Sequence, residues 1–418
     1  MGDAGVDAAA ELSTPRFVVP EPGYRHGERI GFDDLALTAA GEVRRPDPDT
    51  DAESIRDLAF ALIRVLDEDG AAVGPWAGTL SDDELVAGLR DMLLVRAFDA
   101  RMLRSQRQGK TSFYIQSLGE EAVACAHRRA QRAGDMNFPT YRQQGLLIAS
   151  DYPLVAMINQ IYSNRDDPMK GHQLPVMYSS RQHGFFTVSG NLATQFVQAV
   201  GWAMAAAISG SDHVASAWIG DGATAESDYH AGMVFASTYR PPVVLNVVNN
   251  QWAISTFQGL ARGGAGTFAA RGLGFGIASL RVDGNDYLAV HAVSQWAIER
   301  ARQGLGPTLI EWVTYRVGAH STSDDPSAYR PNEEVAAWPL GDPVARLRDH
   351  LIGQGVWSKE SHDEAVSEVD AAVRDAESEA EAHGTLRSDD AASPALIFED
   401  LFENLTPHLH RQRQQLGY

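Results

Sequence analysis

The sequence predicts an α/β fold in which a parallel sheet is flanked by helices, with an extended N-terminal arm and a C-terminal helical segment. Residues 214–219 are a short apolar run and residues 243–248 are an apolar, β-branched run, both of strand length. Residues 225–238 between them are long enough for a crossover helix. Two strands joined by one helix lie parallel. A third buried strand is expected at residues 308–314, within a region where short β-rich runs alternate with Ala-rich helical ones.

The chain divides into three predicted regions. Residues 1–80 form an N-terminal arm and helix, residues 81–340 form the α/β domain, and residues 341–418 form a C-terminal helical segment. Residues 1 to about 50 are rich in Pro, Gly, Asp and Ala and have little hydrophobic periodicity. We therefore expect an arm that is ordered only by packing on another surface.

Four segments predict helices around the sheet. Residues 81–108 begin with a capping box and continue as an amphipathic helix. Residues 192–208 are Ala-rich and helical in pattern. Residues 359–383 predict an acidic helix whose charged side chains lie on a solvated face. The basic residues at 408–413 suit the C-terminal end of an ordinary helix.

The composition excludes several classes of protein. The formal net charge of the chain is −20, and its sequence shows no basic stripe. Nucleic acid and anionic membranes are therefore not expected as partners. No apolar run is long enough to cross a bilayer. Cys125 is the only cysteine, and its apolar surroundings favour a buried small hydrophobe over a reactive thiol. The N-terminal sequence does not resemble a signal peptide, so we expect a cytoplasmic enzyme.

Polar residues follow both central strands. The turn Gly220-Asp221-Gly222 ends the first strand, and Asn249-Asn250 ends the second. Because the carboxyl ends of parallel strands open onto the same crevice, we expect Asp221 and Asn250 to lie together. One carboxylate oxygen and one amide oxygen suit Mg²⁺, which prefers oxygen ligands and shares its coordination with phosphate. The sequence therefore predicts a site for a metal-bound diphosphate.

A nicotinamide dinucleotide site is the strongest alternative, because residues 220–225 also fit G-x-G-x-x-A between a strand and a helix. Such a site requires an acidic residue near the end of the second strand to bind the ribose, where this chain has Asn249 and Asn250. Without a metal, Asp221 would also repel a diphosphate by about 4 kcal/mol per unit-charge pair at about 4 Å. A bound dication reverses that sign. A non-catalytic scaffold is the third possibility, and the presence of both halves of the metal motif disfavours it.

The spacing of this motif resembles that of thiamine-diphosphate enzymes, since 29 residues separate Asp221 from Asn250. Over nearly its full length, the chain is also similar to the alpha subunits of bacterial branched-chain 2-oxoacid dehydrogenases. The segments that carry this similarity are 112–121 (SFYIQSLGEE), 139–142 (PTYR), 190–195 (GNLATQ) and 315–325 (YRVGAHSTSDD). The resemblance implies the thiamine-diphosphate-binding fold, with thiamine diphosphate and Mg²⁺ as cofactors.

The resemblance also assigns a cofactor site. Mg²⁺ would be held by Asp221, Asn250 and the main-chain carbonyl of Trp252. The remaining cofactor contacts would come from Tyr141, Arg142, Gly190, Asn191, Leu192, Gly220, Gly222, Ala223 and His320. The guanidinium of Arg142 suits phosphate oxygens, although it could instead form a surface ion pair. In an acidic chain, Arg142 and His320 would supply local cations beside the diphosphate, with the main-chain amides after Gly222.

A structural monovalent cation is implied by the same resemblance. K⁺ would be bound by oxygen atoms of Ser189, Asn191, Thr194 and Gln195. Relatives commonly carry a proline where this chain has Asn191. Either residue offers a main-chain carbonyl oxygen as a ligand.

His320 lies in a polar segment that matches the active-site loop of the family. A neutral imidazole there would lie near the thiazolium ring and would aid acyl transfer to lipoamide. Ser321 matches a regulatory phosphorylation site of animal relatives, where a phosphate beside Asp324 and Asp325 would add repulsion and disorder the loop.

The implied substrate is a branched-chain 2-oxoacid. Phe113 and Tyr114 match residues that line the pocket for the substrate side chain, and the alternative is that both are core aromatic residues. Pyruvate is the alternative substrate, because one or two methylene groups in an apolar pocket are worth only about 1–3 kcal/mol.

The implied reaction also requires partner proteins. After decarboxylation, the acyl group would pass to the lipoyl group of a transacylase. Relatives take a catalytic glutamate from a separate beta subunit, and this chain shows no second pyrimidine-binding half. We therefore expect an α₂β₂ heterotetramer.

Overall fold

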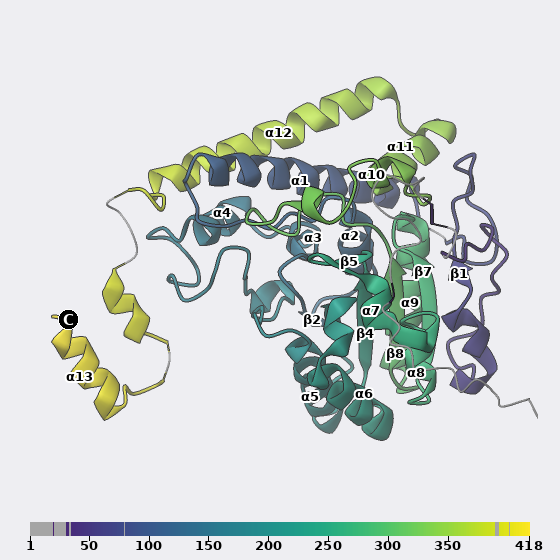
Figure 1. Ribbon diagram of the computed structural model, residues 1–418, viewed down its shortest axis with the longest axis horizontal. Helices are drawn as coiled ribbons and strands as arrows, with labels where there is room; N and C mark the ends of the chain where they lie inside the picture. Colours follow the sequence, from purple (N-terminus) through teal and green to yellow (C-terminus); the bar gives the residue numbers. More distant parts are fainter. Residues whose placement is uncertain (1–19, 21–30, 33–34, 79, 389–392, 401) are drawn as a thin grey trace, which may run out of the picture.

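The computed structural model of the protein describes residues 20, 31–32, 35–78, 80–388, 393–400 and 402–418. Its centre is a sheet of six parallel strands in the order β1-β7-β8-β4-β3-β2 (Figure 1). These strands are β1 (Leu62–Ile63), β2 (Met136–Phe138), β3 (Ala215–Gly220), β4 (Val243–Asn249), β7 (Ala278–Asp283) and β8 (Thr308–Val313). A separate antiparallel pair is formed by β5 (Trp252–Ala253) and β6 (Thr256–Phe257). The predicted α/β fold with a parallel sheet is confirmed.

The three strands expected from the sequence, β3, β4 and β8, lie side by side within this sheet. Their sequences are mostly apolar because both faces of the sheet are covered, although Asn246 in β4 and Glu311 in β8 are buried polar residues. In β4, Val243, Leu245 and Val247 belong to one hydrophobic core, whereas Val244 and Val248 belong to the other. The sheet therefore separates two cores, and the two-residue period of a strand decides which core each side chain enters.

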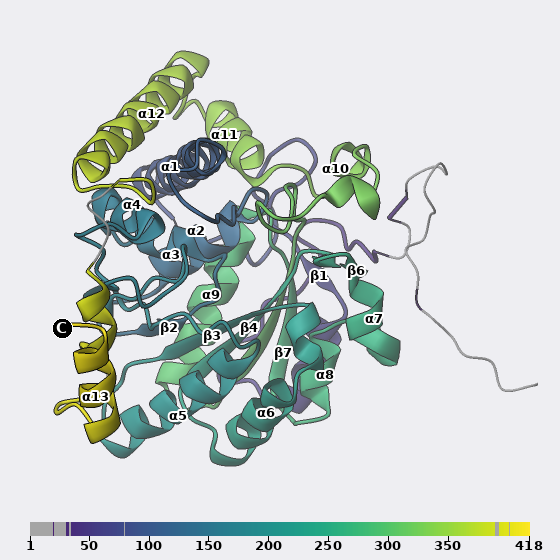
Figure 2. The same ribbon diagram turned by 60° about the vertical axis from the view of Figure 1, so that its left-hand side comes forward.

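Helices cover both faces of the sheet (Figure 2). Helices α5 and α6 pack on one face, α2 and α9 pack on the other, and α1 and then α12 lie outside α2. The α-helices are α1 (Asp82–Arg107), α2 (Glu121–Ala130), α3 (Gln144–Ile148), α4 (Leu154–Tyr162), α5 (Thr194–Ile208), α6 (Ser227–Tyr239), α7 (Gln258–Arg262), α8 (Ala270–Leu273), α9 (Tyr287–Arg302), α10 (Glu334–Ala337), α11 (Pro343–Gly353), α12 (Lys359–Ala382) and α13 (Pro407–Gln415). Short 3₁₀ helices are η1 (Ala52–Ala59), η2 (Arg181–His183), η3 (Gly222–Ala225), η4 (Gly263–Ala265), η5 (Pro326–Ala328) and η6 (Pro394–Phe398).

The direction in which the chain crosses the sheet reverses beside β4. The chain moves one way from β3 to β4 and the opposite way from β7 to β8. Because such crossovers are right-handed, the connecting helices α6 and α9 lie on opposite faces. Open α/β sheets bind ligands at the carboxyl ends of strands beside such a switch point. The fold itself therefore directs attention to the ends of β3 and β4.

The helices predicted from the sequence form close to their expected bounds. Helix α1 begins with the expected capping box, in which the Ser81 side chain accepts from the Glu84 amide and the Glu84 carboxylate accepts from the Ser81 amide at 2.8 Å. The crossover helix α6 begins after η3, and α5 begins two residues later than expected. Arg413 lies in the last turn of α13, where a cation suits the helix dipole as predicted.

The solvated charged face expected for α12 is confirmed, with one exception. Most of its charged residues lie on the exposed face, but the Glu377 side chain is only 1% exposed. Arg101 and Ser105 of α1 and Tyr162 of α4 all donate hydrogen bonds to this carboxylate. Glu377 therefore joins α12 to the domain, because its charge has partners in the helices beneath.

Most of the predicted N-terminal arm lies outside the described residues, so its extended course stays a prediction. In the described part, β1 pairs in parallel with β7 and forms one edge of the sheet. A strand of two residues has no periodicity that a sequence could reveal, and it was not expected.

Two properties inferred from composition can be compared with the structure. Cys125 is buried in α2, and this burial raises the pKa of its thiol well above the usual range, as expected for an unreactive cysteine. In the part of the chain that the structure describes, no helix combines the length and the apolar character needed to cross a bilayer.

Candidate active site

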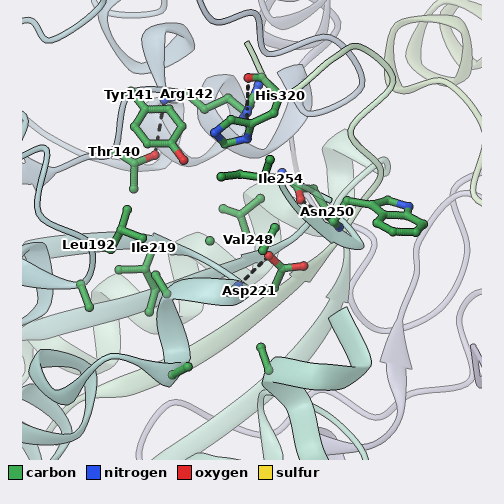
Figure 3. Close-up of a pocket in the computed structure, with 18 of the residues that line it drawn as sticks. Thr140, Tyr141, Arg142, Leu192, Ile219, Asp221, Val248, Asn250, Ile254 and His320 are labelled. Carbon is green, nitrogen blue, oxygen red and sulfur yellow. Dashed lines mark hydrogen bonds between the residues drawn. The ribbon is translucent and has the colours of Figure 1, made fainter. Parts of the chain in front are cut away.

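A cavity of about 600 Å³ opens at the carboxyl ends of β3 and β4, beside the switch point of the sheet (Figure 3). Nearly all residues predicted to contact the cofactor or Mg²⁺ line it. These residues are Tyr141, Arg142, Gly190, Leu192, Gly220, Asp221, Gly222, Ala223, Asn250, Trp252 and His320. Asn191 is the exception, because it is exposed and does not line the cavity. The structure thus brings together five segments that are separate in the sequence.

Asp221 follows β3 directly and is only 2% exposed. Its Oδ1 accepts a hydrogen bond from the Gly222 amide at 2.7 Å, whereas Oδ2 is buried with no hydrogen-bond partner among the described residues. Burial raises the pKa of this carboxyl to about 7, with a further upward contribution from Glu120 and opposition from the Gly222 hydrogen bond. An unpaired buried carboxylate oxygen is costly unless a cation binds it. Asp221 therefore fits a metal ligand.

Asn250 and Trp252 offer the other two oxygen atoms. The Asn250 Nδ2 donates to Glu120 Oε1 at 2.7 Å, and its Oδ1 has only a long contact of 3.5 Å with the Trp252 amide. The Trp252 carbonyl accepts from Arg316 Nη1 at 2.8 Å and keeps a second lone pair. A carboxylate, an amide and a carbonyl oxygen form the all-oxygen donor set that Mg²⁺ prefers.

These ligands alone would not fill an octahedral shell. Among the described residues, no group of three or more His, Cys, Asp or Glu side chains could enclose a metal. Mg²⁺ usually completes its coordination with water and substrate phosphates. The donor set thus fits a metal that is bound together with a diphosphate.

The glycines of the cavity divide into two kinds. A Cβ atom at Gly222 would collide with the Ala253 side chain, so the packing between η3 and β5 requires a glycine there. A Cβ atom at Gly220 would meet no protein atom within 4 Å, and at Gly190 it would meet only Met177 Cε at 3.6 Å. The space beside Gly220 and Gly190 is therefore open to a ligand.

Arg142 is a buried cation of the cavity, with 5% of its surface exposed. Its Nη1 donates to the Gln116 carbonyl, its Nη2 donates to the His320 carbonyl at 3.0 Å, and its Nε lies 3.6 Å from Glu120 Oε1. Tyr141 lies beside it on the cavity wall. The alternative of a surface ion pair for Arg142 is wrong, because the guanidinium is fixed inside the cavity.

His320 lines the same cavity, with its ring centroid 5.8 Å from that of Tyr141 (Figure 3). Burial, followed by the nearby charges of Arg142 and Arg316, lowers the pKa of His320 to about 4. The imidazole is thus uncharged near neutral pH in this structure, which favours the expected proton-transfer role of His320 over that of a local cation. Arg142 Nη2 lies 3.3 Å from Nδ1. Because an arginine can only donate, Nδ1 accepts and Nε2 carries the ring proton.

The loop that carries His320 is held by its own carboxylate. Asp324 Oδ2 accepts from the His320 amide at 2.7 Å and from the Tyr329 hydroxyl at 2.7 Å. Ser321 is partly exposed, and its hydroxyl accepts from the Ser323 amide at 3.2 Å. The role of Ser321 as a phosphorylation site stays a prediction.

The cavity also contains a strained turn. Gln251 and Ile254 have left-handed backbone conformations, with φ of 74° and 54°. Such a conformation costs on the order of 1–3 kcal/mol, and it is most unusual for a β-branched residue such as isoleucine. Arg316 Nη2 donates to the Ile254 carbonyl at 2.9 Å, while its Nη1 donates to that of Trp252. Arg316 thus holds the turn that presents the Trp252 carbonyl.

The four residues predicted for K⁺ lie at the start of α5. Gln195 Nε2 donates to the Ser189 carbonyl at 3.1 Å, and the Thr194 hydroxyl lies 3.3 Å from Asp228 Oδ2. Gln195 Oε1 is buried with no hydrogen-bond partner among the described residues. The Asn191 carbonyl accepts from the Ser189 hydroxyl at 3.4 Å. K⁺ binding by this group stays a prediction.

Phe113 and Tyr114 do not line the cavity. Tyr114 is fully buried, and its hydroxyl donates to the carboxylate of Asp99 at 2.6 Å. Tyr114 therefore has the position of a core residue, which was the alternative given above. A substrate contact for Phe113, which is partly buried, stays a prediction.

Two charged residues of the site had not been assigned a role from the sequence. Glu120 is a fully buried carboxylate of the cavity wall, and Arg316 is 1% exposed. Neither residue has a distinctive local signal, since Glu120 is followed by a second glutamate and Arg316 is a single charge in a neutral stretch. The contacts of Glu120 with Asn250 and of Arg316 with Trp252 join residues more than 60 positions apart in the sequence, and so only the fold reveals them.

The chain matches two family models. Residues 89–388 match the model described as dehydrogenase E1 component, and residues 13–53 match the one described as 2-oxoisovalerate dehydrogenase E1 alpha subunit N terminal. The chain is 61% identical to the 2-oxoisovalerate dehydrogenase subunit alpha of Pseudomonas aeruginosa, over 96% of this chain and 98% of that protein. It is 38% identical to the mitochondrial 2-oxoisovalerate dehydrogenase subunit alpha of Mus musculus, over 88% of this chain and 85% of that protein.

The chain therefore belongs to the dehydrogenase E1 component family. Within it, the similarity identifies a 2-oxoisovalerate dehydrogenase alpha subunit, part of the E1 component of branched-chain 2-oxoacid dehydrogenase. The resemblance inferred from the motifs is confirmed. The nicotinamide and scaffold alternatives find no support in these comparisons.

Proposed function

We propose that this chain decarboxylates branched-chain 2-oxoacids with thiamine diphosphate and Mg²⁺ bound in the cavity at the ends of β3 and β4. The observation that carries the proposal is the unpaired, buried Oδ2 of Asp221, which lines the same cavity as the Asn250 amide. A site that keeps a carboxylate oxygen buried without a donor gains most from a cation.

The chain's own residues supply binding and orientation. Asp221, Asn250 and the Trp252 carbonyl would hold Mg²⁺. Arg142 and Tyr141 would hold the diphosphate together with the amides that follow Gly222, where the start of a helical turn favours an anion. The open space beside Gly190 and Gly220 would accept the rest of the cofactor.

When bound, thiamine diphosphate supplies the carbon nucleophile and the electron sink for loss of CO₂. The protein must then position a proton near the reacting carbonyl. His320 is suited to this task because its imidazole is neutral and its Nε2 carries the proton. Burial of the imidazole, and then the positive charges of Arg142 and Arg316, lower its pKa and keep it neutral.

We also propose the partners that this chemistry requires. A beta subunit would complete the aminopyrimidine half of the site in an α₂β₂ heterotetramer, and a lipoyl transacylase would accept the acyl group. The names of the relatives as alpha subunits support the first partner. A cytoplasmic location, a bound K⁺ at residues 189–195 and a substrate contact by Phe113 belong to the same proposal.

Steady-state rates test the proposal. The chain is co-expressed with its beta subunit and assayed on 2-oxoisovalerate, 4-methyl-2-oxopentanoate and pyruvate with thiamine diphosphate and Mg²⁺. We expect the two branched substrates to have a kcat/KM at least about 10-fold above that of pyruvate, since methylene groups in an apolar pocket contribute about 1–3 kcal/mol. Preference for pyruvate would reassign the substrate, and decarboxylation by the chain alone would contradict the need for a beta subunit.

A further inference from the structure

Glu120 is a carboxylate placed where an anionic ligand is expected. It precedes α2, lines the cavity and is only 4% exposed. A second buried negative charge beside Asp221 would weaken the binding of a diphosphate unless it contributed something else to the site. The contacts of Glu120 indicate what it contributes.

Glu120 touches one group from each half of the proposed cofactor site. Its Oε1 accepts from Asn250 Nδ2 at 2.7 Å and lies 3.6 Å from the Nε of Arg142. Asn250 belongs to the metal site, and Arg142 belongs to the diphosphate site. One carboxylate therefore connects the two.

The contact with Asn250 has a chemical consequence. An asparagine amide can turn either its oxygen or its nitrogen toward a ligand, and only the oxygen binds a hard cation. An ionised carboxylate accepts hydrogen bonds and cannot donate them. Facing Glu120, the amide must present Nδ2 to the carboxylate, and its Oδ1 is then left for the cavity. Glu120 thus selects the amide orientation in which Asn250 is a ligand.

The contact of Glu120 with Arg142 also fixes the orientation of a side chain in the cavity. The guanidinium has fixed acceptors in the carbonyls of Gln116 and His320, and Glu120 lies at its Nε edge. A guanidinium that is held on these sides keeps one orientation inside the cavity.

We propose that Glu120 is a positioning residue that orients the Asn250 amide for metal binding and holds Arg142 beside it, an inference that rests on the proposed function. Outer partners of this kind typically change metal affinity by about 10–100-fold when they are removed. The hydrogen bond to Asn250 carries this effect, so a neutral acceptor should preserve most of it.

Metal titrations of the complex with the beta subunit test the proposal. Mn²⁺ affinity is measured by calorimetry and electron paramagnetic resonance in the presence of thiamine diphosphate. Glu120→Met, which has no strong acceptor, is expected to weaken Mn²⁺ binding about 10–100-fold. Glu120→Gln, which can turn its amide oxygen toward Asn250, is expected to stay within about 5-fold of the wild type. Thermal unfolding of both variants reports whether the fold is kept.

A double variant separates orientation from general structural support. Asn250→Asp offers an oxygen in either orientation, so it should restore Mn²⁺ affinity in the Glu120→Met background. In the wild-type background it should weaken binding, because two carboxylates would then face each other. Unchanged affinity in Glu120→Met, or failure of Asn250→Asp to restore it, would overturn the role of Glu120. Absence of Mn²⁺-dependent cofactor binding in the wild type would overturn the proposed function as well.

Discussion

Two buried carboxylates of this protein have opposite surroundings. Glu377 on α12 accepts hydrogen bonds from Arg101, Ser105 and Tyr162. Burial alone would raise its pKa, but the hydrogen bonds outweigh this effect and leave the pKa below its usual value. Asp221 at the end of β3 has one amide donor and an unpaired Oδ2, and its pKa is raised to about 7.

The difference between them separates a structural role from a ligand-binding role. The donors around Glu377 come from α1 and α4, so its charge fastens α12 to the domain. Because Asp221 Oδ2 has no hydrogen-bond donor among the described residues, it is available to bind a cation. Burial is common to both residues, and the supply of hydrogen-bond donors distinguishes them.

The largest expected effect concerns Asp221. Asp221→Asn should weaken Mg²⁺-dependent binding of thiamine diphosphate more than about 100-fold, since it removes the charged ligand of the metal. Its free energy of unfolding without metal should be unchanged or higher, because a buried charge lacking a partner is removed. Calorimetry and urea denaturation measure the two quantities. Unchanged affinity for the cofactor would remove Asp221 from the site.

The second prediction concerns Glu377. Glu377→Met should lower the free energy of unfolding by about 2 kcal/mol, because Tyr162 and Arg101 lose a charged acceptor. Cofactor affinity of the folded protein should stay unchanged, because α12 lies away from the cavity. Glu379→Gln on the exposed face of the same helix is the matched control and should change stability by less than about 0.5 kcal/mol. Equal effects of the two substitutions would show that the buried contacts of Glu377 contribute little.

The smallest predicted effect concerns His127, a buried histidine whose uncharged ring has hydrogen-bond partners at both nitrogens. The two ring nitrogens of His127 lie 2.9 Å from the hydroxyls of Ser294 and Ser216, and burial lowers its pKa to about 3. As pH falls below about 6.5, the unfolded chain binds a proton that folded His127 does not, so stability is lost. As pH falls from about 6.5 to about 5.5, the wild type should lose about 1 kcal/mol more of its free energy of unfolding than His127→Gln does. Parallel pH profiles in urea denaturation would contradict this assignment.

Patterns local in the sequence predicted the framework of the fold. Largely apolar segments of strand length predicted β3, β4 and β8, because strands covered on both faces are mostly apolar. The Gly220–Gly222 turn and Asn250 could be paired from sequence because one crossover helix fixes their relation. The edge strand β1 was not predicted, because a strand of two residues is too short to show a hydrophobic periodicity.

Contacts between distant segments could not be predicted. Glu120 and Asn250 are 130 residues apart, and nothing around either one indicates the hydrogen bond between them. The neutral state of His320 likewise depends on Arg142, which lies 178 residues away. Glu377 looked like its exposed neighbours on an acidic helix, because its burial depends on side chains from α1 and α4.

Anomalous diffraction from crystals of the complex with the beta subunit, grown with thiamine diphosphate and Mn²⁺ in place of Mg²⁺, tests the central claim most directly. The account predicts one Mn²⁺ peak in the cavity within about 2.1 Å of an Asp221 carboxylate oxygen, the Asn250 Oδ1 and the Trp252 carbonyl. A metal bound to the diphosphate without Asp221 and Asn250 among its ligands would contradict it.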